Sequence, residues 1–222
     1  RTGVLYYPDN ANLKVDIGNS INILSVTSSD KKEIFTVGME FMAYAKSTNY
    51  KGYRLQIDAV DGFFGGNISY TKNLESKDRF LSRLRFIHNS AHLVDGSYDI
   101  HEDRWIQREP VPYTRDFAEL TLAHEMNTSS HSLKYFGGFA YSVMVRPENQ
   151  LRTTYHAGFE LALIRALGSV LNNETDIFIA HYFRLNGIDA YTGSQQTQLG
   201  VKFGNWFKKG VVVYLSYYSG AD

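Results

Sequence analysis

The sequence predicts an all-β fold, an antiparallel up-and-down barrel of about ten strands. Three observations predict it. Apolar and polar residues alternate along most of the 222 residues, and this two-residue period is that of a β-strand. The alternating runs are about 10 to 14 residues long, whereas strands of globular proteins typically have five or six. Short polar segments rich in turn-forming residues separate the runs.

Ten runs carry the alternation. The alternating residues that identify them span 13–21, 35–43, 53–70, 79–90, 118–125, 133–146, 155–163, 177–184, 196–203 and 211–217. With the residues that flank these spans, most of the predicted strands reach about 10 to 14 residues, and the strand at 53–70 is longer. Within a single domain of residues 1–222, we expect residues 1–12 to be an irregular lead-in and residues 93–111 to be a long loop. Residues 157–171 have helical propensity, but their flanking alternation predicts a strand that runs into a loop.

The number of strands depends on Asp61-Gly62. This pair is either a two-residue hairpin turn or a bulge in one long strand that continues through Tyr70. We favour the bulge, which gives ten strands. A hairpin turn gives eleven, or twelve if the lead-in contributes a strand. In a membrane barrel, ten strands with a periplasmic N-terminus place the end of the strand 79–90 near the inner leaflet, whereas the hairpin turn would place it at the outer leaflet.

The two faces of the predicted strands differ in charge, and a soluble and a membrane barrel would place these faces in opposite ways. One face is apolar and almost free of charge. The other face carries Asp16, Glu40, Arg54, Asp58, Arg83, Arg85, Glu119, Glu125, Lys134, Glu160, Asp176, Arg184 and Lys202. In a transmembrane barrel the apolar face meets lipid and the charges pair in a polar lumen. A soluble lipocalin-like binder is the alternative, and it places the apolar face inside.

Strand length and aromatic residues favour the membrane. A tilted membrane strand needs about 9 to 11 residues. Aromatic residues gather near strand ends, as an interfacial girdle requires: Tyr44, Tyr50, Tyr53, Tyr70, Trp206, Phe207, Tyr217 and Tyr218. A barrel of about ten strands is narrow and is filled by side chains, so we expect no open pore. Equal numbers of basic and acidic residues, 23 each, argue against a nucleic-acid partner.

The strand 79–90 ends in the only pattern that suggests chemistry. His88 and Ser90 are two residues apart and therefore share the apolar face. A serine beside a histidine that a carboxylate orients is the minimum for an activated nucleophile. Glu102 is our candidate acid, and Asp95 is the alternative. The competing interpretation is that His88 and Ser90 are polar residues at a membrane interface.

Residues 85–95, Arg-Phe-Ile-His-Asn-Ser-Ala-His-Leu-Val-Asp, resemble the H-x-S-S-H-L-G-D signature of a family of bacterial envelope proteins of unknown function. Ala91 replaces the second serine and Val94 the glycine. Residues 113–116, Tyr-Thr-Arg-Asp, look like that family's Y-S-R-E. The same stretch is similar to the H-x-S-N core of the lipid A 3-O-deacylases, with Ala91 in place of asparagine. Those enzymes are outer-membrane barrels with a serine, histidine and glutamate triad on the lipid-facing side.

With these resemblances, we expect a barrel in the outer membrane of a Gram-negative bacterium, with membrane lipid or lipopolysaccharide as its partner. The sequence leaves the oligomeric state open, and we favour a monomer. A structural or lipid-binding role is the first hypothesis. The second is a lipid-modifying serine esterase with Ser90 as nucleophile, His88 as base and Glu102 as acid. We expect neither cofactor nor metal. An acidic, histidine-containing loop offers oxygen and nitrogen ligands at His92, Asp95, Asp99, His101, Glu102 and Asp103, but their spacing favours a solvated loop.

Overall fold

The computed structural model describes residues 2–8, 12–50, 54–74, 77–93, 98–99, 102–105, 113–170 and 172–220. The strands are β1 (Thr2–Tyr7), β2 (Asn12–Thr27), β3 (Glu33–Tyr50), β4 (Arg54–Asn73), β5 (Arg79–Leu93), β6 (Tyr98–Asp99), β7 (Arg104–Trp105), β8 (Tyr113–Asn127), β9 (His131–Arg146), β10 (Thr153–Leu163), β11 (Ser169–Val170), β12 (Asn173–Asn186), β13 (Thr192–Phe203) and β14 (Val211–Ser219). Among the described residues there is no helix of the length and apolarity that crosses a membrane.

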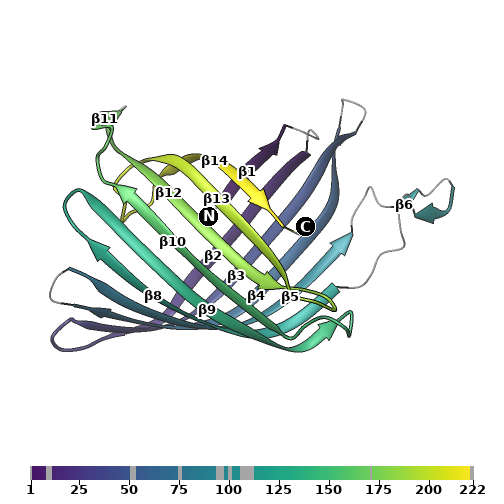
Figure 1. Cartoon of the computed structure of the whole chain (residues 1–222), viewed down its shortest axis with the longest axis horizontal. Coiled ribbons are helices and arrows are strands. Elements are labelled where there is room, and N and C mark those ends of the chain that lie inside the picture. Colours follow the sequence, from purple (N-terminus) through teal and green to yellow (C-terminus); the bar gives the residue numbers. More distant parts are fainter. Residues whose placement is uncertain are drawn as a thin grey trace.

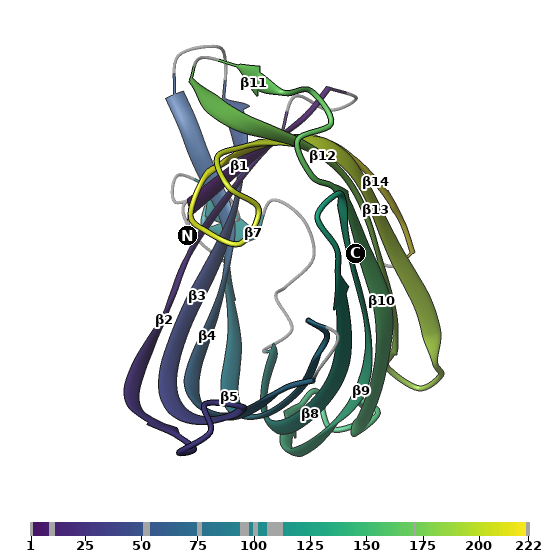
Figure 2. The same ribbon diagram turned by 90° about the vertical axis from the view of Figure 1, so that its left-hand side faces the viewer.

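The main sheet is a curled antiparallel meander. Its strand order is β1-β2-β3-β4-β5-β8-β9-β10-β12-β13-β14, and β11 adds to β12. The curl produces two walls that face each other, one of β2 to β5 and one of β8 to β14 (Figure 2). The small β6–β7 hairpin forms a separate sheet and stands clear of the main one (Figure 1). The predicted all-β, up-and-down architecture is therefore confirmed.

Each of the ten alternating runs lies in a strand of this sheet. β4 continues without a break through Asp61 and Gly62, as favoured, so the hairpin alternative is wrong. The bulge lies three residues earlier, because Ile57 and Ala59 pair with the adjacent residues Ser47 and Lys46 and leave Asp58 as the extra residue. The lead-in differs from the prediction, since it contains β1, whose six residues pair with the start of β2.

The two faces of the sheet differ in polarity. We call the face toward the interior of the curl the inner face and the opposite one the outer face. The inner face buries the charged or polar side chains Glu40, Asn67, Asn89, Arg115, Glu125 and His156. The outer face exposes large apolar side chains, among them Met39, Phe41, Phe64, Phe86, Phe139 and Leu199. The buried apolar cluster is small, with Ile87, Phe117 and Ala140 packed against Phe63.

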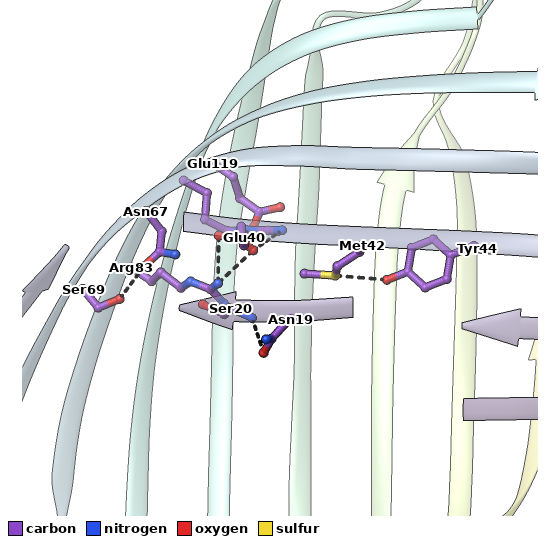
Figure 3. A network of polar contacts seen from close by, with 10 residues as sticks. Asn19, Ser20, Glu40, Met42, Tyr44, Asn67, Ser69, Arg83 and Glu119 are labelled. Carbon is purple, nitrogen blue, oxygen red and sulfur yellow. Dashed lines mark hydrogen bonds and ion pairs between the residues drawn. The ribbon is translucent and has the colours of Figure 1, made fainter. Parts of the chain in front are cut away.

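An ion-pair network fills part of the inner face (Figure 3). The Glu40 carboxylate accepts two hydrogen bonds of 2.9 Å from Arg83 and two of 3.1 and 2.8 Å from Arg85. Arg85 also donates to Glu119 at 2.9 Å. Glu40 lies on β3 and both arginines lie on β5, so these bonds cross over β4.

Small residues on β4 make this crossing possible. Gly65 pairs with Glu40 on one side and with Ile87 on the other. A Cβ at Gly65 would lie 1.9 Å from the carbonyl oxygen of Phe86, which is far inside van der Waals contact. Glycine is therefore required here because the backbones of β4 and β5 approach closely.

Candidate functional site

The end of β5 places the predicted site residues on the outer face. Ile87 and Asn89 point inward and are 3% and 2% exposed. Because side chains alternate along a strand, Phe86, His88 and Ser90 point outward. The site is therefore a polar patch on a face that is otherwise apolar, near the end of the curled sheet where β5 ends and β8 begins.

His88 is held by a carboxylate from the neighbouring strand. His88 and Asp116 are directly opposite in the β5–β8 ladder, and His88 Nδ1 lies 2.5 Å from Asp116 Oδ1. Each side chain is 37% exposed. On the other side, the Phe64 ring lies 4.8 Å from the imidazole, centroid to centroid. Because a carboxylate accepts, Nδ1 carries the proton, and Nε2 is the nitrogen left for a ligand.

Ser90 is hydrogen-bonded to His92. The distance from His92 Nε2 to Ser90 Oγ is 3.0 Å, and both residues lie on the outer face. Opposite Ser90, β4 presents Gly62, which has no side chain to cover the hydroxyl. A serine hydroxyl bonded to an imidazole nitrogen can lose its proton to that nitrogen during attack on a carbonyl carbon. The pair is therefore the chemically competent part of the site.

These partners differ from the predicted ones. We expected His88 to be the base for Ser90, with Glu102 or Asp95 as the acid. In the structure the imidazole on Ser90 is that of His92, and the carboxylate on His88 is Asp116. Glu102 is exposed in the turn before β7, and Asp95 lies outside the described residues. Among the described residues, no carboxylate is hydrogen-bonded to His92.

Sequence reasoning missed Asp116 because Asp116 follows His88 by 28 residues. Only the register of β5 against β8 brings the two together. One signal was available: Asp116 ends the Tyr-Thr-Arg-Asp stretch that looks like Y-S-R-E.

On the inner face, Arg83 and Arg85 pair with carboxylates. Glu119 contacts Arg85, whereas Asp58 accepts a hydrogen bond from Thr48 at 2.8 Å. A cavity of about 230 Å³ borders Arg83, Arg85, Glu119 and Lys134. Lys134 pairs with Glu160 at 3.0 Å. Three basic side chains, Arg83, Arg85 and Lys134, are thus paired with three carboxylates, Glu40, Glu119 and Glu160. Their charges sum to zero, so the cavity has no net charge that would attract an ion.

The described residues contain no group of three or more histidine, cysteine, aspartate or glutamate side chains placed to hold a metal ion. Of the acidic loop, Asp95 and His101 lie outside the described residues, and so does the side chain of Asp99.

Comparisons with known proteins add no relative: no family model, no curated protein and no solved structure matches the chain. The fold and the patch formed by His88, Ser90, His92 and Asp116 are the evidence on which a function rests.

Proposed function

We propose that the chain is an outer-membrane β-barrel of a Gram-negative bacterium that contacts membrane lipid or lipopolysaccharide through its outer face and forms no open pore. The reversed polarity of the sheet carries this proposal. Large apolar side chains on the outer face are half exposed, such as Phe64 and Phe86 at 54% each, while the Glu40 side chain on the inner face is 1% exposed. A soluble binder requires the opposite arrangement.

The dimensions support the same proposal. β3 and β4 have 18 and 20 residues, more than the roughly 9 to 11 that a tilted strand needs to cross the hydrocarbon layer. The residues beyond this length extend the ends of the strands into the lipid headgroup layer. The patch lies near such an end, where polar side chains avoid the cost of several kcal/mol that an unpaired polar group pays in hydrocarbon. His88 and His92 then face the phosphate and carbonyl groups of lipids.

Fractionation tests the barrel proposal. The expected result is that the chain is found in the outer-membrane fraction, requires detergent for extraction, and migrates differently on gels before and after heating. A chain that stays in the aqueous fraction as a folded species without detergent would contradict the proposal.

A second candidate function, a serine esterase acting on lipid, is favoured by the 3.0 Å contact between Ser90 and His92. Ser90 Oγ would attack the ester carbonyl while His92 takes the hydroxyl proton. The proton would then pass to the leaving alkoxide, and water would release the acyl group from Ser90 by the reverse sequence. Asp116 would hold His88 beside the reacting ester as a positioning group.

Mass spectrometry of phospholipids and of lipid A tests the esterase. A ten-stranded barrel with a periplasmic N-terminus places the patch near the inner leaflet, which holds phospholipid, whereas lipid A lies in the outer leaflet. Cells expressing the wild type are expected to lose one acyl chain from phospholipid, or from lipid A in the opposite orientation, and cells expressing Ser90→Ala or His92→Ala are not. The matched control is Ser82→Ala, because Ser82 is on the same face of β5 near its other end. Unchanged phospholipid and lipid A with a wild-type barrel that resides in the outer membrane would refute the esterase and leave the lipid-contact proposal intact.

A further inference from the structure

The main sheet has two edges that no described strand covers. β1 pairs only with residues 12–17 of β2, and residues 19–27 of β2 are all exposed. At the other edge, β14 pairs with β13 and ends the sheet. Both edges alternate outer apolar and inner polar or small residues, with Ile21 and Leu24 on one and Val213 and Leu215 on the other. Long, flat, apolar edges pair with other strands unless they are protected.

The direction of the strands allows these edges to pair. From β2 to β14 the sheet order contains ten strands, and every neighbouring pair is antiparallel. Ten alternating strands place the first and the last antiparallel to each other. β1 is antiparallel to β2 and is therefore parallel to β14. Closure through β2 thus keeps every neighbouring pair antiparallel, whereas closure through β1 does not.

We propose that the sheet closes into a ten-stranded barrel by antiparallel pairing of β14 with β2, with Tyr214 opposite Ser20. In this register Tyr217, Tyr218 and Ser219 take the positions beside Ile17, Asp16 and Val15 that the first three residues of β1 occupy in the structure. Closure displaces these three residues and leaves the last three residues of β1 beside β2. Each open edge of the sheet thus pairs with the other edge of the same chain, β2 with β14.

The register follows from the stagger of the ladders. A path straight across the sheet starts at Thr27 on β2 and reaches Tyr218 on β14 through the observed partners. Pairing Tyr214 with Ser20 sets Tyr218 opposite Asp16. The path then returns to β2 about ten residues from its start, discounting the residue inserted at the irregularity between Asn22 and Leu24.

This offset of about ten residues is the stagger of the barrel. With ten strands, a rise of about 3.3 Å per residue and a distance of about 4.8 Å between neighbouring strands, it gives a tilt of about 35° between the strands and the barrel axis. Barrels tilt by about 35 to 45°. A stagger of eight gives about 29°, outside this range. A stagger of twelve gives about 40° but sets β14 against residues 13–21, where it would displace five of the six residues of β1, whereas a stagger of ten displaces three.

The faces also match in this register. On the inner face Tyr214 meets Ser20 and Val212 meets Asn22. On the outer face Val213 meets Ile21. A shift by one residue would place Tyr214 against an outer residue of β2, which the alternation forbids.

Disulfide cross-linking tests the closure, because the sequence has no cysteine. The double variant Ser20→Cys with Tyr214→Cys is oxidised in outer membranes and examined by non-reducing gel and mass spectrometry. The expected result is an intramolecular disulfide formed at least ten times more completely than in the control Asn19→Cys with Tyr214→Cys, whose cysteines lie on opposite faces. The pair Asn22→Cys with Val212→Cys tests the same register at a second level.

Two outcomes would overturn the proposal. One is the absence of an intramolecular disulfide in both same-face pairs when both proteins are folded by heat-modifiability. The other is cross-linking only between molecules, which would assign the edges to a second copy. A disulfide in either same-face pair and not in the control supports it, including when the other pair fails to fold.

Discussion

Replacing Phe139 with lysine distinguishes a lipid-facing outer surface from a water-facing one by the size of the loss in stability. Phe139 is on the outer face of β9, eight residues from its start, and is 49% exposed. In water, lysine at a half-exposed position costs little. In a bilayer, lysine at the midplane costs about 2 to 4 kcal/mol, falling to about 0 to 1 near the interface.

Two variants separate charge from depth. Phe139→Ala removes the ring without adding charge, so the difference between Phe139→Lys and Phe139→Ala isolates the charge. Met144→Lys adds the same charge on the outer face near the strand end, where Met144 is 65% exposed. We expect Phe139→Lys to be less stable than Phe139→Ala by about 2 to 4 kcal/mol and Met144→Lys to lose less than about 1 kcal/mol.

The assay is reversible urea unfolding of the refolded barrel in phospholipid vesicles, followed by tryptophan fluorescence. Equal stabilities of Phe139→Lys and Phe139→Ala, with unfolding midpoints and slopes that coincide, would refute the membrane orientation of the outer face. That result would mean that the outer face meets water, and that the ion pairs of Glu40, Arg83 and Arg85 lie inside a water-soluble protein.

Other positions give further tests. Glu40→Gln removes the charge that Arg83 and Arg85 share and is expected to cost about 3 kcal/mol in the same unfolding assay, because a buried pair loses one partner; an unchanged midpoint would contradict this. Gly65→Val is expected to prevent formation of the heat-modifiable barrel, because its Cβ would overlap a carbonyl oxygen; a normal yield of folded protein would show that β4 and β5 can separate. In the turn after β2, hydrogen bonds from Ser28 and from the Lys32 backbone N–H lower the pKa of Asp30, so its stabilisation is present above its ordinary pKa and is lost as the pH falls through the lowered value. Ser28→Ala should raise this pKa in an NMR titration of the carboxyl group, and an unchanged value would refute the assignment to Ser28.

The strands and their faces could be predicted from the sequence because they are local properties. Alternation with period two identifies a strand and sorts its residues between two faces without knowledge of its neighbours. The assignment of Glu40, Arg83 and Arg85 to the charged face followed from this alone, and the choice of the inward face needed the strand length and the aromatic residues as well. β1 was missed because only a part of β2 pairs with it and its short run, Thr2–Tyr7, shows little alternation.

The partners within the site could not be predicted because they depend on register. His88 and Asp116 meet only if β5 and β8 pair with the offset that the loop of residues 94–112 permits, and a loop of that length sets no offset by itself. The choice of imidazole for Ser90 depends on side-chain rotamers, since His88 and His92 are both two residues away. Sequence spacing treats these two histidines as equal.

The hydrogen bonds from Arg83 and Arg85 to Glu40 also bear on the order of assembly. The β3–β4 hairpin contains the Glu40 carboxylate and neither arginine, and the β4–β5 hairpin contains both arginines and no carboxylate of this network. Strands β3, β4 and β5 together keep one positive charge in excess. Glu119 on β8 neutralises it through its hydrogen bond with Arg85. In the proposed membrane location, insertion of β3, β4, β5 and β8 as one unit therefore has a lower barrier than insertion hairpin by hairpin, and the smallest neutral unit around this network is a four-stranded meander.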